Sequence, residues 1–351
     1  MKKASYVIEP YYQRNACFDL SDKVKNRDGA MYFAWALRNA LAKRGYDLQT
    51  DDIHSPHDSE IAIYADMPRY SAPLPRPENR SKSYLIAFES ELILKSNWLP
   101  ENQQRFHTVF TWHDELIAKN ASTKDPGATK FVKSNFTFKL PKGPLPKPFS
   151  ERKLITLISG NKAVRHPLEL YSARRDFIRW AEAHIPSDFE YYGIGWEWFY
   201  LRGGFFHKVL RKLGLLKYMP KSPSRCYRGK VVDKFPVLEG YRFSLCFENG
   251  RDIPGYITEK IFDSMIAGCV PVYWGANNIA DHIPTDCFID YRQFASRPNP
   301  HRELVDYLRA MPESRWQEYQ NAIRSYFNSE KAKAFDADAW AEMVASHVTS
   351  N

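Results

Sequence analysis

The stretch RFSLCFENGRDIPGYITEKIFDSMIAGCVPVYWG, residues 242–275, decides the fold class of this chain. FSLCFEN is a short apolar and aromatic run, GRDIPGY is rich in turn-forming residues, and VPVYWG is a second apolar run. Between them, ITEKIFDSMIAG repeats apolar residues at helical spacing and closes at Gly268. A strand, a helix and a second strand in this order form a βαβ unit, which implies a parallel sheet with a right-handed crossover.

The segments on either side repeat this alternation. Strands are expected at YVIEP, SEIAIYAD, SYLIAFES, HTVFTW, KLITLIS and EYYGIGW, and helices around AMYFAWALRNALAKRG and LELYSARRDFIRWAEAH. Between the two halves, LPKGPLPKPFSERK carries prolines at nearly alternate positions, which hold a backbone extended. We therefore predict two facing Rossmann-like domains, at residues 1–140 and 153–351, joined by a Pro-rich linker at 141–152.

Length and composition limit the function classes. The chain has 351 residues, of which 44% are hydrophobic and 26% charged, which is enough for two domain cores. No stretch approaches the roughly 18 apolar residues that a membrane-spanning helix needs, and Glu9 and Pro10 interrupt any signal peptide. The five cysteines lie at scattered spacings without a CxxC pair, so we expect reduced thiols, no structural metal and a cytoplasmic protein.

The net charge of +9 favours a polyanion, an anionic membrane surface or a phosphate-bearing small molecule as partner. Residues 202–230 hold nine Lys or Arg and no acidic residue, and within them GFFHKVLRKLGLLKY places apolar residues at helical spacing. Two interpretations remain open for this basic helix. It packs on its own domain with the basic side in solvent, or it lies on an anionic membrane.

The loop from Glu248 to Tyr256 is the expected ligand site, because ligands of open α/β sheets bind beyond the carboxyl ends of the strands. The N-terminus of the following helix offers backbone N–H groups and a positive dipole to phosphate. There Lys260 adds a cation, and Glu259 can accept hydrogen bonds from sugar hydroxyls. An ordinary first-turn acid and a solvated lysine fit the same pattern. Neither GxxxxGK[ST] nor GxGxxG is present, so the residues alone indicate an anion site of unspecified kind.

The order FEN, GY, TEK, PV and YWG resembles the signature of the α-1,3/4-fucosyltransferases, glycosyltransferase family 10. The matching residues are Phe247, Glu248, Asn249, Tyr256, Thr258, Glu259, Lys260, Ile261, Pro271, Val272, Tyr273, Trp274 and Gly275. SYLIAFESELI followed by FTWHDEL, and LISGN followed by an Arg-bearing helix, resemble other family segments more weakly. The resemblance implies a GT-B enzyme, with a cleft between two facing Rossmann-like domains, the acceptor mainly on the first and GDP-fucose on the second.

The resemblance also implies roles for single residues. The positions that match donor-binding residues are Arg174, Asn249, Tyr256, Glu259 and Lys260. Arg175, one residue along, is the alternative to Arg174. Glu89 of FES matches the proposed general base, with Glu91 and Asp114 as the nearest rivals.

The expected function is that of an inverting glycosyltransferase that moves L-fucose from GDP-fucose to a hydroxyl of a GlcNAc- or Glc-containing glycan, in an α-1,3 or α-1,4 linkage. A carboxylate takes the proton of the acceptor, while Lys260, Arg174 and the helix terminus stabilise the diphosphate. No cofactor is expected to be required, and a divalent metal would be at most stimulatory. Expected partners are the GDP-sugar and an oligosaccharide, polysaccharide or lipid-linked acceptor, in the cytoplasm with peripheral contact at the inner face of an anionic membrane.

Some features depart from the family pattern. The loop carries one additional residue, with Arg251, Asp252 and Pro254, and residues 196–240 match no family segment. The membrane anchor and stem of animal members are missing from this sequence, so a soluble bacterial-type enzyme is expected. The first alternative is the same fold with another GDP-sugar. The second, suggested by the charge alone, is a basic nucleic-acid-binding protein, although no recognised binding motif supports it.

Overall fold

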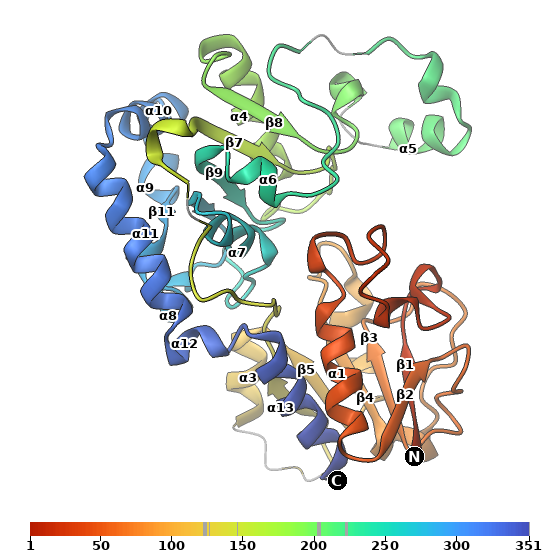
Figure 1. Cartoon of the computed structure of the whole chain (residues 1–351). Helices are drawn as coiled ribbons and strands as arrows, with labels where there is room; N and C mark the ends of the chain where they lie inside the picture. Colours follow the sequence, from red (N-terminus) through yellow and green to blue (C-terminus); the bar gives the residue numbers. More distant parts are fainter. Residues whose placement is uncertain (122–124, 126, 146, 202–204, 222–223, 351) are drawn as a thin grey trace. The chain divides into compact units, whose positions relative to one another are not determined.

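The computed structural model describes residues 1–121, 125, 127–145, 147–201, 205–221 and 224–350. The chain divides into two compact units (Figure 1). The first unit comprises Met1–Leu140, Pro254–Tyr256 and Ser329–Asn351, and the second comprises Pro141–Ile253 and Ile257–Asn328.

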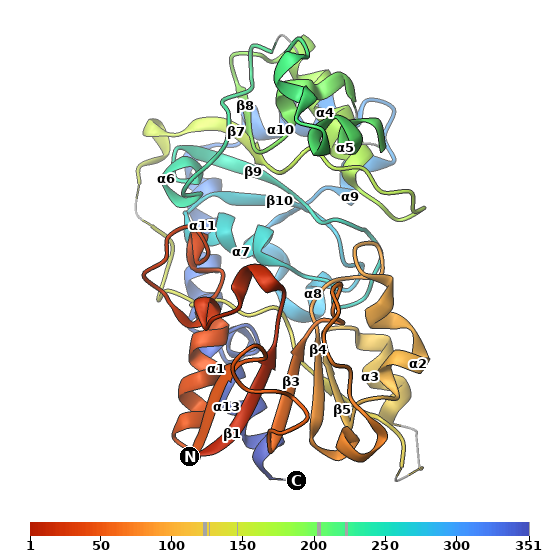
Figure 2. The same cartoon turned by 90° about the vertical axis from the view of Figure 1, so that its right-hand side faces the viewer.

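The first unit contains a six-stranded sheet in which every neighbouring pair of strands is parallel. In spatial order the strands are β2 (Tyr46–Thr50), β1 (Lys2–Val7), β3 (Ile61–Ala65), β4 (Ser83–Ala87), β5 (Thr108–Thr111) and β6 (Lys130–Lys133). Figure 2 shows this sheet with α1 and α13 along it. The helices of this unit are α1 (Tyr32–Ala42), α2 (Pro100–Gln103), α3 (Asp114–Ala121), α12 (Glu330–Lys333) and α13 (Ala337–Thr349).

Alternate residues of the central strands point to opposite faces of this sheet, and each face has its own apolar core. On one face, Ile61 and Ile63 of β3 join a cluster with residues of α1 and α13. On the other, Ala62 and Tyr64 pack with Phe106. The strands are therefore buried on both sides, as parallel strands require.

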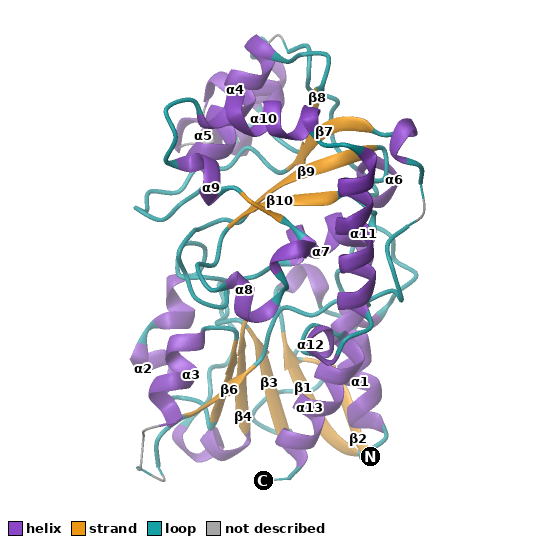
Figure 3. Ribbon diagram, turned by 90° about the vertical axis from the view of Figure 1, so that its left-hand side faces the viewer, coloured by secondary structure: helices purple, strands orange, loops and turns teal. Residues whose placement is uncertain are grey.

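Helix α13 corrects the predicted domain boundary, which placed all of residues 153–351 in the second domain. Its residues Trp340, Ala341 and Val344 are buried in the core of the first unit with α1, and Trp340 Nε1 donates to Ser134 Oγ (2.8 Å). Figure 3 shows α13 running beside α1. The apolar period of a helix predicts which side is buried but not which sheet buries it, so the sequence could not place this segment.

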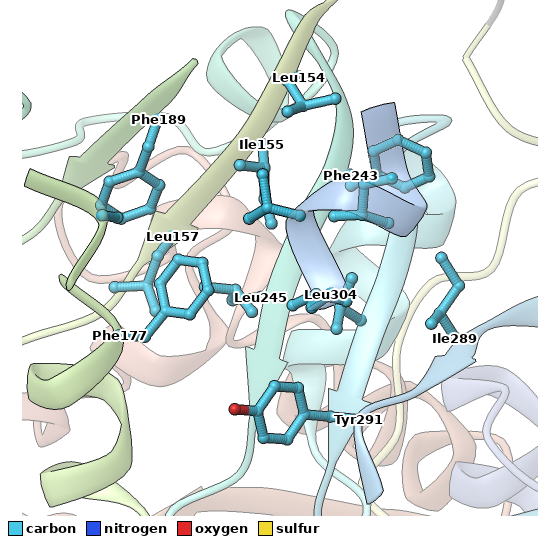
Figure 4. Close-up of a cluster of buried hydrophobic side chains, with 14 of the residues drawn as sticks. Leu154, Ile155, Leu157, Phe177, Phe189, Phe243, Leu245, Ile289, Tyr291 and Leu304 are labelled. Carbon is cyan, nitrogen blue, oxygen red and sulfur yellow. The ribbon is translucent and has the colours of Figure 1, made fainter. Parts of the chain in front are cut away.

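The second unit contains a five-stranded sheet, again parallel throughout. Its strands in spatial order are β11 (Ile289–Asp290), β10 (Val270–Trp274), β9 (Tyr241–Phe247), β7 (Lys153–Ile158) and β8 (Phe189–Tyr192). The helices are α4 (Tyr171–His184), α5 (Phe205–Lys212), α6 (Phe235–Leu238), α7 (Glu259–Ile266), α8 (Ile279–His282), α9 (Arg292–Ala295), α10 (Pro300–Ala310) and α11 (Glu313–Phe327). Figure 4 shows the core between the sheet and its helices, where Ile155, Phe177 and Phe243 are completely buried.

Both sheets begin with the same strand order. The first strand of each unit, β1 or β7, lies between the second and the third. In this doubly wound arrangement the chain reverses its direction of winding beside the first strand, and ligands bind beyond the carboxyl ends of the strands at that point. The prediction of two Rossmann-like α/β domains is confirmed. A ligand is therefore expected beyond the carboxyl end of β9 in the second unit, and beyond the carboxyl end of β3 in the first.

The predicted βαβ unit is present as β9, α7 and β10, and Gly268 after α7 has the left-handed φ of +68° that a helix end favours. Strands β2, β6 and β11 were not predicted from the sequence. The predicted linker belongs to the second unit, because Leu145 N donates to Ile266 O (2.8 Å) and Arg152 is buried with its guanidinium bonded to Tyr241 O (3.2 Å). Pro146 lies outside the described residues. None of the described helices has the length and apolar character that a membrane crossing needs.

Candidate functional site

Glu248 joins the carboxyl end of β9 to the first turn of α7. Its side chain is completely buried, and its carboxylate accepts hydrogen bonds from the backbone N–H of Thr258 (2.8 Å) and from the Thr258 hydroxyl (2.7 Å). Lys260 Nζ lies 3.2 Å from Glu248 Oε2. A buried carboxylate is tolerated when it is paired and hydrogen-bonded in this way, so Glu248 ties the start of the loop to the N-terminus of the helix.

Lys260 and Glu259 form a charged pair in the first turn of α7. Lys260 Nζ donates to Thr258 Oγ1 (2.9 Å) and lies 3.3 Å from Glu259 Oε1. Burial would lower the pKa of Lys260, but the charges of Glu248 and Glu259 outweigh burial and raise this pKa. Burial would raise the pKa of Glu259, but Lys260 and Lys234 lower it to about 2. Both side chains are therefore charged at neutral pH, and both remain partly exposed to a ligand.

Arg174 of α4 reaches the same loop. Its Nη2 donates to Phe247 O and Glu248 O (both 2.6 Å) and to Asn249 Oδ1 (3.1 Å). Arg175 points elsewhere and donates to Asn161 Oδ1 (2.5 Å). Helical geometry turns neighbouring side chains apart by about 100°, so only one of the two arginines can face β9. The structure brings Arg174, and not Arg175, together with Asn249 and the start of α7.

The loop after Asn249 is held by backbone hydrogen bonds. Leu170 N donates to Asn249 O (3.1 Å), Arg251 N donates to Leu168 O (2.8 Å), and Asp252 N donates to Gly275 O (2.9 Å). The additional loop residues noted in the sequence thus form an ordered turn, in which Arg251 also pairs with Asp252 (2.7 Å). Four of the five predicted donor-binding residues, Arg174, Asn249, Glu259 and Lys260, lie around this loop.

The fifth, Tyr256, lies in the first unit, together with the rest of Pro254–Tyr256. Its ring is buried 4.8 Å from that of Trp112 and 6.1 Å from that of Phe136. Gly255 has a φ of +82°, and a Cβ at this position would lie 2.1 Å from Trp112 O. Only glycine fits such a close backbone approach. The sequence pattern did not predict that this end of the loop packs with aromatic residues of the first unit.

Glu89 directly follows Phe88 at the carboxyl end of β4. Its backbone N–H donates to Asp66 Oδ1 (3.0 Å), and its carbonyl accepts from Asn97 Nδ2 (3.1 Å) and Trp98 Nε1 (2.9 Å). Both backbone polar groups of Glu89 are therefore fixed by neighbouring side chains. The side chain of Glu89 is half-buried, at the edge of the sheet where ligands of α/β domains bind.

The two rival bases are less well suited to proton transfer. Asp114 Oδ1 lies 2.5 Å from Lys133 Nζ, and a cation so close stabilises the charged form of a carboxyl and weakens it as a base. Glu91 is exposed to solvent. These contacts favour Glu89 among the three candidates.

Two acidic residues that the sequence pattern did not single out lie at these sites, Glu248 and Asp66. Each directly follows a strand that is buried on both faces, β9 or β3. Asp66 Oδ1 accepts hydrogen bonds from Phe88 N (2.7 Å), Glu89 N (3.0 Å) and Asn97 Nδ2 (2.7 Å). Burial, with a smaller contribution from the charge of Glu89, raises the pKa of Asp66 to about 7. An acidic residue at the carboxyl end of an apolar run was the signal that could have identified both.

The predicted basic helix is present as α5, and the apolar residues of the helix and of the turn after it are partly buried and partly exposed. Phe205 is 83% exposed and Phe206 61% exposed, and Leu213 after the helix is 62% exposed, whereas Leu210 is buried. Arg202 lies outside the described residues, as do the side chains of Lys208 and Lys217.

All five cysteines are buried free thiols. In the part of the chain that the structure describes, no cluster of three or more His, Cys, Asp or Glu side chains is arranged to hold a metal ion.

Residues 222–348 match the family model described as "Glycosyltransferase family 10 (fucosyltransferase) C-term". Alpha-(1,3)-fucosyltransferase FucT of Helicobacter pylori is 34% identical over 79 residues, which cover 22% of this chain and 16% of that protein. An alpha-(1,4)-fucosyltransferase of Arabidopsis thaliana is 37% identical over 75 residues, 21% of this chain and 18% of that protein. The chain thus spans less than a fifth of the length of these relatives.

T4 phage BGT, solved in complex with its UDP-glucose substrate, is 13% identical over 99% of both chains, with a TM-score of 0.51. At this identity the likeness concerns the fold, and it agrees with the predicted GT-B class of two parallel-sheet α/β domains.

Proposed function

We propose that the protein is a fucosyltransferase that transfers L-fucose from GDP-fucose to a hydroxyl of a glycan, because residues 222–348 match the model of the C-terminal domain of glycosyltransferase family 10. One observation carries the proposal. Inside the matched domain, Lys260, Glu259 and Asn249 converge with Arg174 at the carboxyl end of β9 and the N-terminus of α7. This arrangement provides two cations and a helix dipole for a diphosphate, and a carboxylate for sugar hydroxyls.

In this proposal the diphosphate of the donor lies at the start of α7. Arg174 and Lys260 stabilise the negative charge that develops on the leaving GDP, together with the backbone N–H groups of the helix. Glu248 holds the ammonium of Lys260 in place and keeps it charged. We assign Tyr256 to the donor site as well, since it lies in the loop that begins at Asn249. With these cations in place we propose that no metal is required, so that activity persists in EDTA and added Mg²⁺ is at most stimulatory.

The transfer inverts the anomeric centre in a single displacement. The acceptor oxygen forms a bond to the anomeric carbon as the bond from that carbon to the phosphate oxygen breaks, and GDP leaves with the electron pair. Glu89 takes the proton of the acceptor hydroxyl as general base. A half-buried carboxylate at the end of β4, with its backbone held on both sides, suits this role.

For the acceptor we propose a GlcNAc- or Glc-containing glycan, fucosylated in α-1,3 or α-1,4 linkage during surface polysaccharide or glycolipid synthesis. The names of the two relatives above, an alpha-(1,3)- and an alpha-(1,4)-fucosyltransferase, support this range of linkages.

We further propose that the protein works at the cytoplasmic face of an anionic membrane, where lipid-linked acceptors are found. Phe205 and Phe206 are exposed in α5, whose last turn carries Arg211 and Lys212. Exposed aromatic rings beside cations suit the headgroup region of an anionic bilayer. Sedimentation with vesicles of phosphatidylcholine and phosphatidylglycerol should therefore fall for Phe206→Ser and stay unchanged for Val24→Ser, which is equally exposed in the first unit.

The test of the donor site is calorimetric binding of GDP, UDP, ADP and CMP. We expect selective binding of GDP that weakens by about 10- to 150-fold in Lys260→Ala, because one charge-assisted contact to phosphate is lost. Lys153→Ala is the matched control, since Lys153 also pairs with a carboxylate (2.9 Å from Glu190) but at the amino end of β7. Transfer from GDP-fucose, compared with GDP-mannose, then tests the sugar. Equal binding of all four nucleotides would remove the basis of the proposal.

A further inference from the structure

Asp66 is a half-buried residue whose carboxyl accepts hydrogen bonds from the backbone of Phe88 and Glu89. It lies directly after β3, and Glu89 lies two residues after the neighbouring strand β4. Asp66 has a φ of +65°, and this left-handed backbone turns its carboxyl toward β4, where one oxygen, Oδ1, accepts from Phe88 N, Glu89 N and Asn97 Nδ2. Within the described residues no hydrogen bond to Oδ2 is formed.

Asn97 forms hydrogen bonds with both Asp66 and Glu89. It is completely buried, its Oδ1 accepts from Met67 N (2.7 Å), and its Nδ2 donates both to Asp66 Oδ1 and to Glu89 O (3.1 Å). The N–H and C=O groups of Glu89 are therefore bonded to the same pair of side chains. This network fixes the backbone of Glu89 and therefore the direction in which its side chain leaves the chain.

We propose that Asp66 is a positioning residue for Glu89: its Oδ1 holds the Phe88–Glu89 backbone, and its charge strengthens the Glu89 carboxylate as a base. This inference rests on the proposed function, in which Glu89 accepts the proton of the acceptor hydroxyl. Asp66 itself acts through Glu89 and takes no part in the transfer.

The charges around Asp66 fit this role. The titratable groups that interact with it are the carboxylate of Glu89 and the buried hydroxyl of Tyr6 on β1. Burial raises the pKa of Asp66 to about 7, so it gains its negative charge near neutral pH. Once ionised, Asp66 is a negative neighbour that raises the proton affinity of the Glu89 carboxylate.

Two substitutions separate the hydrogen bonds from the charge. Asp66→Asn keeps the Oδ1 acceptor and tolerates the left-handed backbone, but removes the charge. Asp66→Gly also tolerates this backbone but removes the whole side chain. We expect Asp66→Gly to lower kcat by about 100-fold, because the base is misplaced, with unchanged affinity for GDP. We expect Asp66→Asn to retain kcat within a few-fold and to lose the inflection near pH 7 that ionisation of Asp66 adds to the kcat/KM profile.

The control is Asp28→Gly, which removes another aspartate with a left-handed backbone (φ +57°) from the first unit; it should leave both profiles unchanged. Circular dichroism melting checks that each variant is folded. Full activity of Asp66→Gly, or an Asp66→Asn variant as impaired as Asp66→Gly that still shows the inflection near pH 7, would overturn the positioning role. Glu89→Gln is measured alongside. If it is active, the proposed base is wrong; if it is inactive while Asp66→Gly is active, only the role of Asp66 is wrong.

Discussion

Each unit contains two neighbouring acidic residues, and the two pairs are held in opposite ways. In the second unit, Glu248 and Glu259 share the ammonium of Lys260, which together with Lys234 lowers the pKa of Glu259 to about 2. In the first unit, Asp66 interacts with amide groups and with the carboxylate of Glu89, and burial raises its pKa to about 7. Glu259 therefore keeps its charge at physiological pH, whereas Asp66 changes its charge near neutrality.

The largest effect is expected from Glu89→Gln, which removes the proton acceptor and keeps the shape of the side chain. We expect kcat for fucosyl transfer to fall by about 10²- to 10⁴-fold, with GDP affinity unchanged in calorimetry. Glu91→Gln is the matched control, since this exposed residue lies two positions along the same segment. If Glu91→Gln is inactive and Glu89→Gln is active, the assignment within this segment must be exchanged.

A smaller but clear effect on stability is expected from Glu248→Gln. The substitution leaves the ammonium of Lys260 without its buried counter-ion, so the free energy of unfolding in urea should fall by about 3 kcal/mol. Glu330→Gln, the same substitution in the exposed Lys333–Glu330 pair, should cost less than about 1 kcal/mol. Equal losses in the two variants would show that Glu248 is no better paired than a surface residue.

The smallest effect is a change in the pH dependence of stability in Asp66→Asn. The pKa of Asp66 is about 7 in the folded protein and 3.8 without the fold, so between these pH values the folded state binds a proton that the unfolded chain has lost. The contribution of Asp66 to stability therefore decreases as pH rises from about 4 to 7.

Asp66→Asn has no carboxyl group at this position and cannot bind this proton. Its melting temperature relative to the parent protein should thus increase between pH 5 and pH 8, as measured by circular dichroism. A constant difference over this range would place the pKa of Asp66 near its ordinary value, and the contrast between the two pairs would disappear.

The sequence predicted more of the surroundings of Glu248 and Glu259 in the second unit than of Asp66 and Glu89 in the first. The run 242–275 contains a strand, a turn and a helix within one continuous segment, so Asn249, Glu259 and Lys260 are close together for local reasons. The resemblance to a family added Arg174, and its contact with Asn249 distinguishes it from Arg175. Glu248 was assigned no role from the sequence, because the acid after an apolar strand was visible there but its pairing with Thr258 and Lys260 was not.

The pair in the first unit depends on the pairing of two strands that lie apart in the sequence. Asp66 and Glu89 meet only because β3 and β4 are adjacent and parallel, with Ala65 opposite Ile86. Periodicity identifies each strand but not its neighbour, so the contact could not be predicted. For the same reason the sequence did not assign α13 to the first unit, nor Tyr256 to the aromatic cluster of Trp112 and Phe136.

The sequence by itself determined the fold class, the βαβ unit at residues 242–275 and the helix N-terminus, at the start of α7, where we propose the anion site. These follow from the alternation of apolar residues over short distances and from the exposed N–H groups of a helix terminus. Only the tertiary structure decided which arginine reaches the loop, that Glu248 is buried, and which side chains bond to the backbone of Glu89. Those properties depend on which strands and helices become neighbours, and the free energy of burial and pairing is set by that packing rather than by any local pattern.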